Sequence, residues 1–287
     1  MKRTRWVLFC VLVFGICIRA DAEPVIAIFS SETGPYREAL AGLKQELGES
    51  VPTFILSQGE PKIPSSTRVV ITFGAKAALR SYSDQITLIY AMAPGVVIQT
   101  QDAVKICMEP AASTLLANLK RIQPNLKRLG ILWQSPRFKE YVDELRKVAG
   151  PLGIQVESVS PKDSSDIPDY LRKLYGRIDA IWIPPDPLLL NATSLPVFME
   201  FSRSNRVPLF VPTGGLVEQG ATASVGPTFR EMGRLAGVAA RKASEGLSPE
   251  SKLYTTNVEI VINKTVATQV GLQIPEDTLR KADKVIP

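Results

Sequence analysis

Histidine is absent from this 287-residue sequence, and only three cysteines are present. The lack of histidine excludes Ser-His-Asp and Cys-His catalysis, histidine acid–base chemistry and nearly all catalytic zinc sites. Three cysteines are too few for a four-cysteine zinc or iron–sulfur site. An enzyme with this composition would have to rely on carboxylates, lysine, tyrosine or a bound cofactor.

Sequence motifs for nucleotide chemistry and acyl transfer are missing as well. The chain has no Walker phosphate loop, no G-x-G-x-x-G, no G-x-S-x-G and no cluster of metal ligands. It also lacks a basic stripe with interleaved aromatic residues. We therefore predict a protein that is not an enzyme, needs no cofactor or metal ion and does not bind nucleic acid.

The N-terminus has the three parts of a secretory signal peptide. A basic segment (Met1–Arg5) precedes a 13-residue apolar run (Trp6–Ile18) and an A-x-A cleavage site that ends at Ala22. The run is shorter than the roughly 20 residues that span a membrane, so we expect a cleaved signal peptide (1–22) and a periplasmic protein. A retained membrane anchor is the alternative. A lipoprotein is disfavoured because Ile16, not a small residue, precedes Cys17.

Removal of residues 1–22 changes the composition. These residues carry a net charge of +3, so the formal +6 of the whole chain falls to +3, which weakens an electrostatic case for nucleic-acid binding. Cys107 is the one cysteine left, so an exported chain would have no internal disulfide. With 45% hydrophobic and 22% charged residues, the chain can build a sizeable core.

Short apolar runs alternate with helical patterns along most of the chain. Apolar runs without polar alternation are typical of parallel strands that are buried on both faces. We expect strands at Val25–Phe29, Val51–Leu56, Val69–Phe73, Ile86–Met92, Arg128–Trp133, Ile154–Val159, Ala180–Ile183, Pro208–Val211, Ala221–Val225 and Val258–Ile262. We expect helices at Pro35–Leu47, Gly74–Ser81, Pro136–Leu152, Ile167–Tyr175, Leu195–Ser204, Phe229–Ser244 and Lys264–Val270.

The order of elements in the first half is repeated in the second, which indicates two similar α/β lobes. The segment after Val211 does not form a third lobe, so we expect it to cross back and complete the two others. The predicted architecture is two Rossmann-like lobes with a hinge and an interlobe cleft. The first lobe would contain residues 23–125 and about 221–250, and the second residues 126–220 and about 253–287.

Ligands of open α/β sheets bind at the carboxyl ends of the strands. Two facing lobes would surround a ligand with the loops that follow their strands. The candidate ligand-binding residues are Ser31, Glu32, Thr33, Tyr36, Phe73, Gly74, Ala75, Tyr90, Trp133, Gln134, Ser135, Tyr141, Pro185, Asp186, Thr213 and Gly214.

Several candidates have a structural alternative. Gly74-Ala75 is either a tight strand-to-helix turn or an anion cradle at a helix start. Asp186 is either a helix N-cap or a counter-charge for a ligand ammonium, and Glu32 is either a solvated loop residue or a second counter-charge. The aromatic candidates either belong to the core or stack on an apolar or aromatic ligand.

A series of segments resembles the substrate-binding proteins of ABC transporters with the type I periplasmic-binding fold, in particular the tryptophan- and tyrosine-type binders. The resemblance covers nearly the whole chain after residue 22 and depends on the order and spacing of the segments. It implies two lobes, three crossovers and a ligand trapped by hinge closure. The matching segments are Leu119–Trp133, Ile178–Pro184, Leu216–Ala221, Gly226-Pro227, Gly233-Arg234, Val261–Asn263 and Gly271-Leu272.

The sequence also departs from that family. Asp186 and Glu32 match family acids, whereas Ala93, Thr213 and Thr228 stand where members often have an acidic residue. Gly74-Ala75 replaces a Gly-Thr pair. The resemblance implies an exported, monomeric solute-binding protein that delivers a small, aromatic or apolar amino-acid-like ligand to a membrane permease. The alternatives are a periplasmic sensor partner of a signalling receptor and a two-lobed glycosyltransferase-like enzyme.

Overall fold

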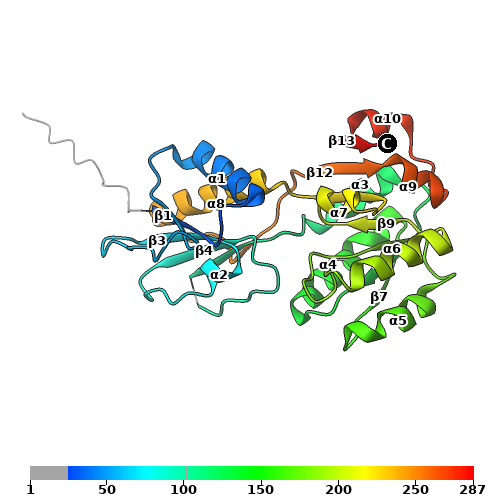
Figure 1. Cartoon of the computed structure of the whole chain (residues 1–287), viewed down its shortest axis with the longest axis horizontal. Helices are drawn as coiled ribbons and strands as arrows, with labels where there is room; N and C mark the ends of the chain where they lie inside the picture. Colours follow the sequence, from blue (N-terminus) through cyan, green and yellow to red (C-terminus); the bar gives the residue numbers. More distant parts are fainter. Residues whose placement is uncertain (1–24, 101) are drawn as a thin grey trace, which may run out of the picture.

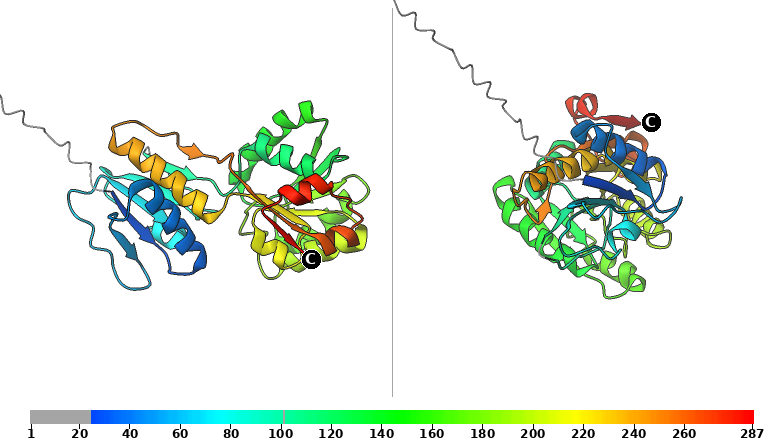
Figure 2. Two further views of the ribbon diagram at one scale, coloured as in Figure 1. Left: turned by 90° about the horizontal axis from the view of Figure 1, so that it is seen from above. Right: turned by 90° about the vertical axis from the view of Figure 1, so that its left-hand side faces the viewer.

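A computed structural model describes residues 25–100 and 102–287, so the expected leader lies outside the described residues. The chain forms two α/β lobes side by side, each built around one sheet (Figure 1). Three segments of the chain pass between the lobes at 107–111, 227–228 and 254–258 (Figure 2). The two-lobed α/β architecture predicted from the sequence is confirmed.

The first lobe has a six-stranded parallel sheet with the order β11-β5-β4-β3-β1-β2. Helices α1 and α8 cover one face of this sheet, and the short helix α2 lies on the other (Figure 1). The strands are β1 (Val25–Phe29), β2 (Thr53–Ile55), β3 (Val69–Phe73), β4 (Thr87–Ala91), β5 (Ala103–Ile106) and β11 (Lys252–Leu253). The helices are α1 (Gly34–Leu47), α2 (Ala75–Ala78) and α8 (Phe229–Ser244).

The second lobe has a seven-stranded sheet, β13-β12-β10-β9-β8-β6-β7, in which only the β10–β12 pair is antiparallel. Helices α3 and α4 pack on one face, and α5, α6 and α7 on the other. The strands are β6 (Arg128–Leu132), β7 (Gln155–Val159), β8 (Ala180–Trp182), β9 (Leu209–Val211), β10 (Ala223–Gly226), β12 (Glu259–Asn263) and β13 (Lys284–Ile286). The helices are α3 (Ala112–Ile122), η1 (Pro136–Phe138), α4 (Lys139–Ala149), η2 (Gly150–Leu152), η3 (Ser164–Asp166), α5 (Ile167–Leu174), α6 (Ser194–Asn205), α7 (Gly214–Glu218), α9 (Lys264–Gln269) and α10 (Glu276–Lys281).

The boundary between the lobes differs from the one predicted from the sequence. Residues 107–125 were expected in the first lobe, but α3 packs its Leu115, Leu116 and Leu119 into the second-lobe core beside Leu129. Residues 221–226 were also expected in the first lobe, but they contain β10, which pairs with β9 and β12 of the second sheet. The apolar face of α3 is buried against the second sheet, whose first strand along the chain, β6, follows the helix directly.

Helices α1 and α8 approach each other unusually closely. A Cβ atom placed on Gly233 would lie 1.9 Å from the backbone oxygen of Ala39, and one placed on Gly42 would lie 1.9 Å from that of Arg230. Glycine at these positions therefore permits contact between the two backbones. This contact lets Ala39, Leu43 and Ala236 share one core with the sheet. Among the described residues, no helix is both long enough and apolar enough to span a bilayer.

Glu231 ties α8 to the third crossover. Its carboxylate accepts hydrogen bonds from Arg234 (2.8 and 2.9 Å), Thr255 (3.3 Å) and Asn257 (3.4 Å), and the residue is 6% exposed. Thr228, in the second crossover, caps α8 by accepting a hydrogen bond from the Glu231 amide (3.0 Å). Glu231 thus joins the second and third crossovers, the second through its backbone amide and the third through its buried carboxylate.

Glu231→Gln is expected to lower the free energy of unfolding by about 1–2 kcal/mol at pH 7, because charged hydrogen bonds are lost. Burial would raise the pKa of Glu231, but the side chains of Arg234, Asn257 and Thr255 outweigh it and hold the pKa below its ordinary value. A lowered pKa stabilises the fold above pH about 4.5, and this stabilisation disappears as the pH falls through the folded-state value. Denaturant titrations at pH 7 and pH 3.5 should therefore show a difference between wild type and variant that shrinks in acid. A difference that stays constant with pH would contradict the assignment.

Candidate ligand-binding site

The carboxyl ends of the strands of the two lobes approach each other. Gly95 follows β4 in the first lobe, and a Cβ atom placed on it would lie 3.0 Å from Pro187, which follows β8 in the second. Arg137 follows β6 and reaches both Glu109 of the first crossover and the Pro185 carbonyl oxygen. The loops that follow the strands therefore meet at the junction of the lobes, where ligands of open α/β sheets bind.

Asp186 is buried and fully hydrogen-bonded. One carboxylate oxygen accepts hydrogen bonds from the backbone amides of Gln134 and Ser135 (both 2.7 Å), and the other accepts one from Leu188 (3.1 Å). The residue has no exposed surface. The expectation that Asp186 offers a free counter-charge to a ligand ammonium is therefore wrong for this structure, because three backbone amides already donate hydrogen bonds to its carboxylate. Asp186 instead caps the turn after β8 and joins it to the loop after β6.

Two hydroxyl groups of the chain, those of Tyr36 and Ser30, occupy the space beside Gly74 in the loop after β3. A Cβ atom placed on Gly74 would lie 2.4 Å from the Tyr36 hydroxyl and 2.5 Å from Ser30 Oγ, and Ser30 Oγ accepts a hydrogen bond from the Ala77 amide (3.0 Å). Burial raises the pKa of Tyr36, and the hydrogen bond with Ser30 partly offsets this. Gly74 has φ +93°, a left-handed conformation that favours glycine. The tight-turn alternative for Gly74-Ala75 is therefore the better supported one.

Three of the aromatic candidates belong to the core. Phe73 is fully buried and stacks on Phe29 with ring centroids 4.5 Å apart. Tyr141 is 3% exposed and donates a hydrogen bond to the Pro110 carbonyl oxygen (2.6 Å), and Tyr90 is 5% exposed in the first lobe. The expectation of a ligand-stacking role is wrong for Phe73 and Tyr141, because neighbouring side chains enclose them. Trp133 is half-buried, and its indole nitrogen has no hydrogen-bond partner in the described structure.

The remaining candidates lie in the segments that follow the strands, on loops or, for Ala75 and Gly214, at the first residue of a helix. Glu32 is exposed and accepts a hydrogen bond from Gln58 Nε2 (2.8 Å), which agrees with its solvated-loop alternative. Gln134 donates to the Lys162 carbonyl oxygen (2.9 Å). Ser135 and Pro185 are buried, Ser31, Ala75, Thr213 and Gly214 are half-buried, and Thr33 is exposed. The role of these residues in binding stays a prediction.

A group of charged residues at the junction was missed from sequence. This junction cluster consists of Lys105 on β5, Glu109 on the first crossover and Arg137 on η1. The exposed side-chain fractions of Arg137 and Glu109 are 8% and 5%, and Lys105 is 8% exposed. Such burial of charged side chains is rare in proteins. The signal in the sequence is the lysine inside the apolar run Ala103–Cys107.

The contacts inside the junction cluster are loose. Arg137 and Glu109 approach to 3.8 Å, and Lys105 Nζ lies 3.4 Å from the Val96 carbonyl oxygen. Arg137 Nε and Glu109 Oε2 are both buried without a hydrogen-bond partner among the described residues. Burial lowers the pKa of Lys105, and the nearby charge of Arg137 lowers it further. The cluster thus has one more positive than negative charge, in surroundings that solvate charge poorly.

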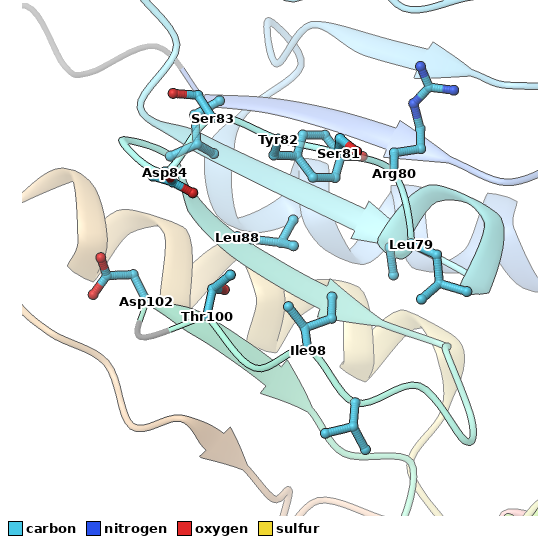
Figure 3. Close-up of a pocket in the computed structure, with 13 residues that line it drawn as sticks. Leu79, Arg80, Ser81, Tyr82, Ser83, Asp84, Leu88, Ile98, Thr100 and Asp102 are labelled. Carbon is cyan, nitrogen blue, oxygen red and sulfur yellow. The ribbon is translucent and has the colours of Figure 1, made fainter.

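A separate hollow lies on the first lobe, on the sheet face that α1 and α8 leave uncovered. It has a volume of ≈ 690 Å³, and its wall includes Tyr82, Asp84, Leu88 and Ile98 (Figure 3). Burial raises the pKa of Tyr82 to about 12, so its hydroxyl stays protonated at neutral pH. None of the sixteen candidate residues lines this hollow. The hollow is therefore distinct from the candidate site at the junction.

Comparison with protein families decides the class of the protein. Residues 110–286 match the family described as "ABC transporter substrate binding protein". The chain belongs to this family. The resemblance seen in the sequence is confirmed, and the matched region covers the end of the first crossover, the second lobe and the returning segments of the first.

Solved structures confirm the type I periplasmic-binding fold. An ABC domain from Streptococcus pneumoniae in complex with L-Trp has a TM-score of 0.61 at 21% identity, and the alignment covers 91% of this chain and 100% of that one. A ligand-free, open substrate-binding protein with adhesive properties from Clostridium difficile has a TM-score of 0.63 at 17% identity, over 91% and 98% of the two chains. At these identities the similarity shows the fold alone.

A curated relative from Clostridioides difficile (strain R20291) is named a tyrosine-binding protein. It is 27% identical over 159 residues, which are 54% of this chain and 46% of the relative. The match therefore spans about half the length of that relative.

Proposed function

We propose that this family member is the solute-binding component of an ABC-type uptake system. It captures a small aromatic or apolar amino acid between its two lobes, releases it unchanged and delivers it to a membrane permease. The observation that carries the proposal is the meeting of the strand carboxyl ends of both lobes at a junction crossed by three chain segments. Such crossovers permit hinge closure around a ligand.

The class of ligand is proposed from the relatives. One relative is named a tyrosine-binding protein, and one solved neighbour contains L-Trp. Half-buried Trp133 at the end of β6 could supply an aromatic surface for such a side chain. Ser31, Thr33 and Thr213 on loops, and Gly214 at the start of α7, would line the site from the two lobes.

Isothermal titration calorimetry tests this function directly. L-Tyrosine and L-tryptophan are expected to bind with a stoichiometry of one and a negative heat-capacity change, because apolar surface is buried. Glycine, which has the same backbone groups without a side chain, is the matched control and should bind far more weakly. Absence of binding by every amino acid tested, at high protein concentration, would overturn the proposal.

Export, monomeric state and permease delivery belong to the same proposal. Mass spectrometry of protein from the periplasm should show a chain that starts at Glu23. Light scattering of the same protein should give the mass of a monomer. Genes for a permease and an ATPase beside this one would support delivery, whereas a neighbouring sensor-kinase gene would favour the signalling alternative.

A further inference from the structure

The junction cluster brings residues of both lobes and of the hinge together. Lys105 comes from the first lobe, Glu109 from the first crossover and Arg137 from the second lobe. Arg137 is further held by a hydrogen bond to the Pro185 carbonyl oxygen (3.2 Å) and by the Phe138 ring, whose centroid lies 3.9 Å from its Cζ atom. A group bound here would touch both lobes and the segment that joins them.

Two polar atoms of the cluster are unpartnered and complementary. Arg137 Nε is a buried donor, and Glu109 Oε2 is a buried acceptor. Leaving such buried atoms unpaired is unfavourable, and more so for charged groups. The two residues do not satisfy each other, because their closest approach is 3.8 Å. The pair can therefore gain hydrogen bonds from a partner that carries both an acceptor and a donor.

An α-amino acid backbone is such a partner. Its carboxylate accepts hydrogen bonds, which suits Arg137 and the excess positive charge that Lys105 brings. Its ammonium donates hydrogen bonds, which suits Glu109. The other acids near the junction are less suitable, because backbone amides occupy Asp186 and Glu32 is exposed beside Gln58.

We propose that the junction cluster binds the backbone of an amino-acid ligand, with Arg137 and Lys105 on the carboxylate and Glu109 on the ammonium. This inference rests on the proposed function and specifies which groups recognise the ligand.

Three related ligands test the assignment by calorimetry. They are L-tyrosine, tyramine (which lacks the carboxylate) and 3-(4-hydroxyphenyl)propionate (which lacks the ammonium). Wild type is expected to prefer L-tyrosine over both by about 10–100-fold, the range of one or two charged hydrogen bonds. Arg137→Gln should reduce the preference over tyramine, because only Lys105 would still hold the carboxylate, but should keep the preference over the propionate. Glu109→Gln should abolish the preference for L-tyrosine over the propionate but keep the preference over tyramine.

Arg172→Gln on the exposed face of α5 is the control, and it should leave all three affinities unchanged. The measured quantity is the ratio of the affinities for the three ligands in each variant. Partial unfolding lowers all three affinities equally and therefore leaves this ratio unchanged. Equal weakening of all ligands, or unchanged ratios, would overturn the assignment while the wild-type affinity still supports the proposed function. Failure of wild type to bind L-tyrosine or any other amino acid would instead overturn the proposed function.

Discussion

Gly233→Ala should be among the most destabilising single substitutions in the first lobe. The new Cβ atom would overlap the backbone oxygen of Ala39, at 1.9 Å, and a backbone atom cannot rotate away as a side chain can. Helices α1 and α8 would have to separate, which opens the core around Leu43 and Ala236. We expect a loss of about 3 kcal/mol or more in the free energy of unfolding, measured by urea titration.

Gly215→Ala is the matched control for this substitution. Gly215 also lies in a helix (α7), and a Cβ atom placed on it meets nothing within 4 Å. Alanine there should be neutral or should stabilise by up to about 1 kcal/mol, because glycine is the poorer helix former. If Gly233→Ala and Gly215→Ala had similar effects, the close contact between α1 and α8 would be refuted.

Asp186→Ala should destabilise the second lobe by about 3–5 kcal/mol. It would leave the amides of Gln134, Ser135 and Leu188 without their acceptor, a carboxylate that has no exposed surface. An unsatisfied buried donor such as the Ser135 amide is strongly unfavourable. Circular dichroism during denaturation would measure the loss. Asp186→Asn keeps one acceptor oxygen and should lose less.

The exposed Asp84 provides the control, since Asp84→Ala should change stability by less than about 0.5 kcal/mol. The same variants decide between the two roles considered for Asp186. If Asp186→Ala weakened ligand binding and left the unfolding transition unchanged, the carboxylate would be a ligand counter-charge after all. Loss of stability supports its role as a cap.

Much of the fold could be predicted from sequence because the strands are buried on both faces. Val69–Phe73 consists of apolar residues and one threonine, and its predicted bounds match β3. The missed strand β5 carries Lys105 in its middle, so it lacks the uniform apolar pattern. No helix was expected at residues 112–122, which were assigned to the first lobe, but they form α3 and pack into the second lobe. Local sequence does not show which sheet covers an apolar helix face.

The candidate site was predicted less well for a related reason. Its position after a strand identified the loop that carries Asp186, but two of its three hydrogen-bond partners lie 51 and 52 residues earlier in the chain. Local sequence contains no sign of such pairing, so a free acid and a fully bonded one look alike. The junction cluster was missed because its three members come from a strand, a crossover and a short 3-10 helix that meet only in the folded chain.

The order of segments along the chain has a consequence for how the protein is made. The first lobe needs residues 25–106 and also α8 and β11, which follow the whole of 112–226. During synthesis its sheet is therefore available long before the helix that buries one face of it. The second lobe can assemble most of its core first, and contacts that wait for distant segments form slowly. No single cut among the described residues separates the two lobes, so a nick at residues 227–228 would leave the N-terminal fragment without α8, the helix that completes its core.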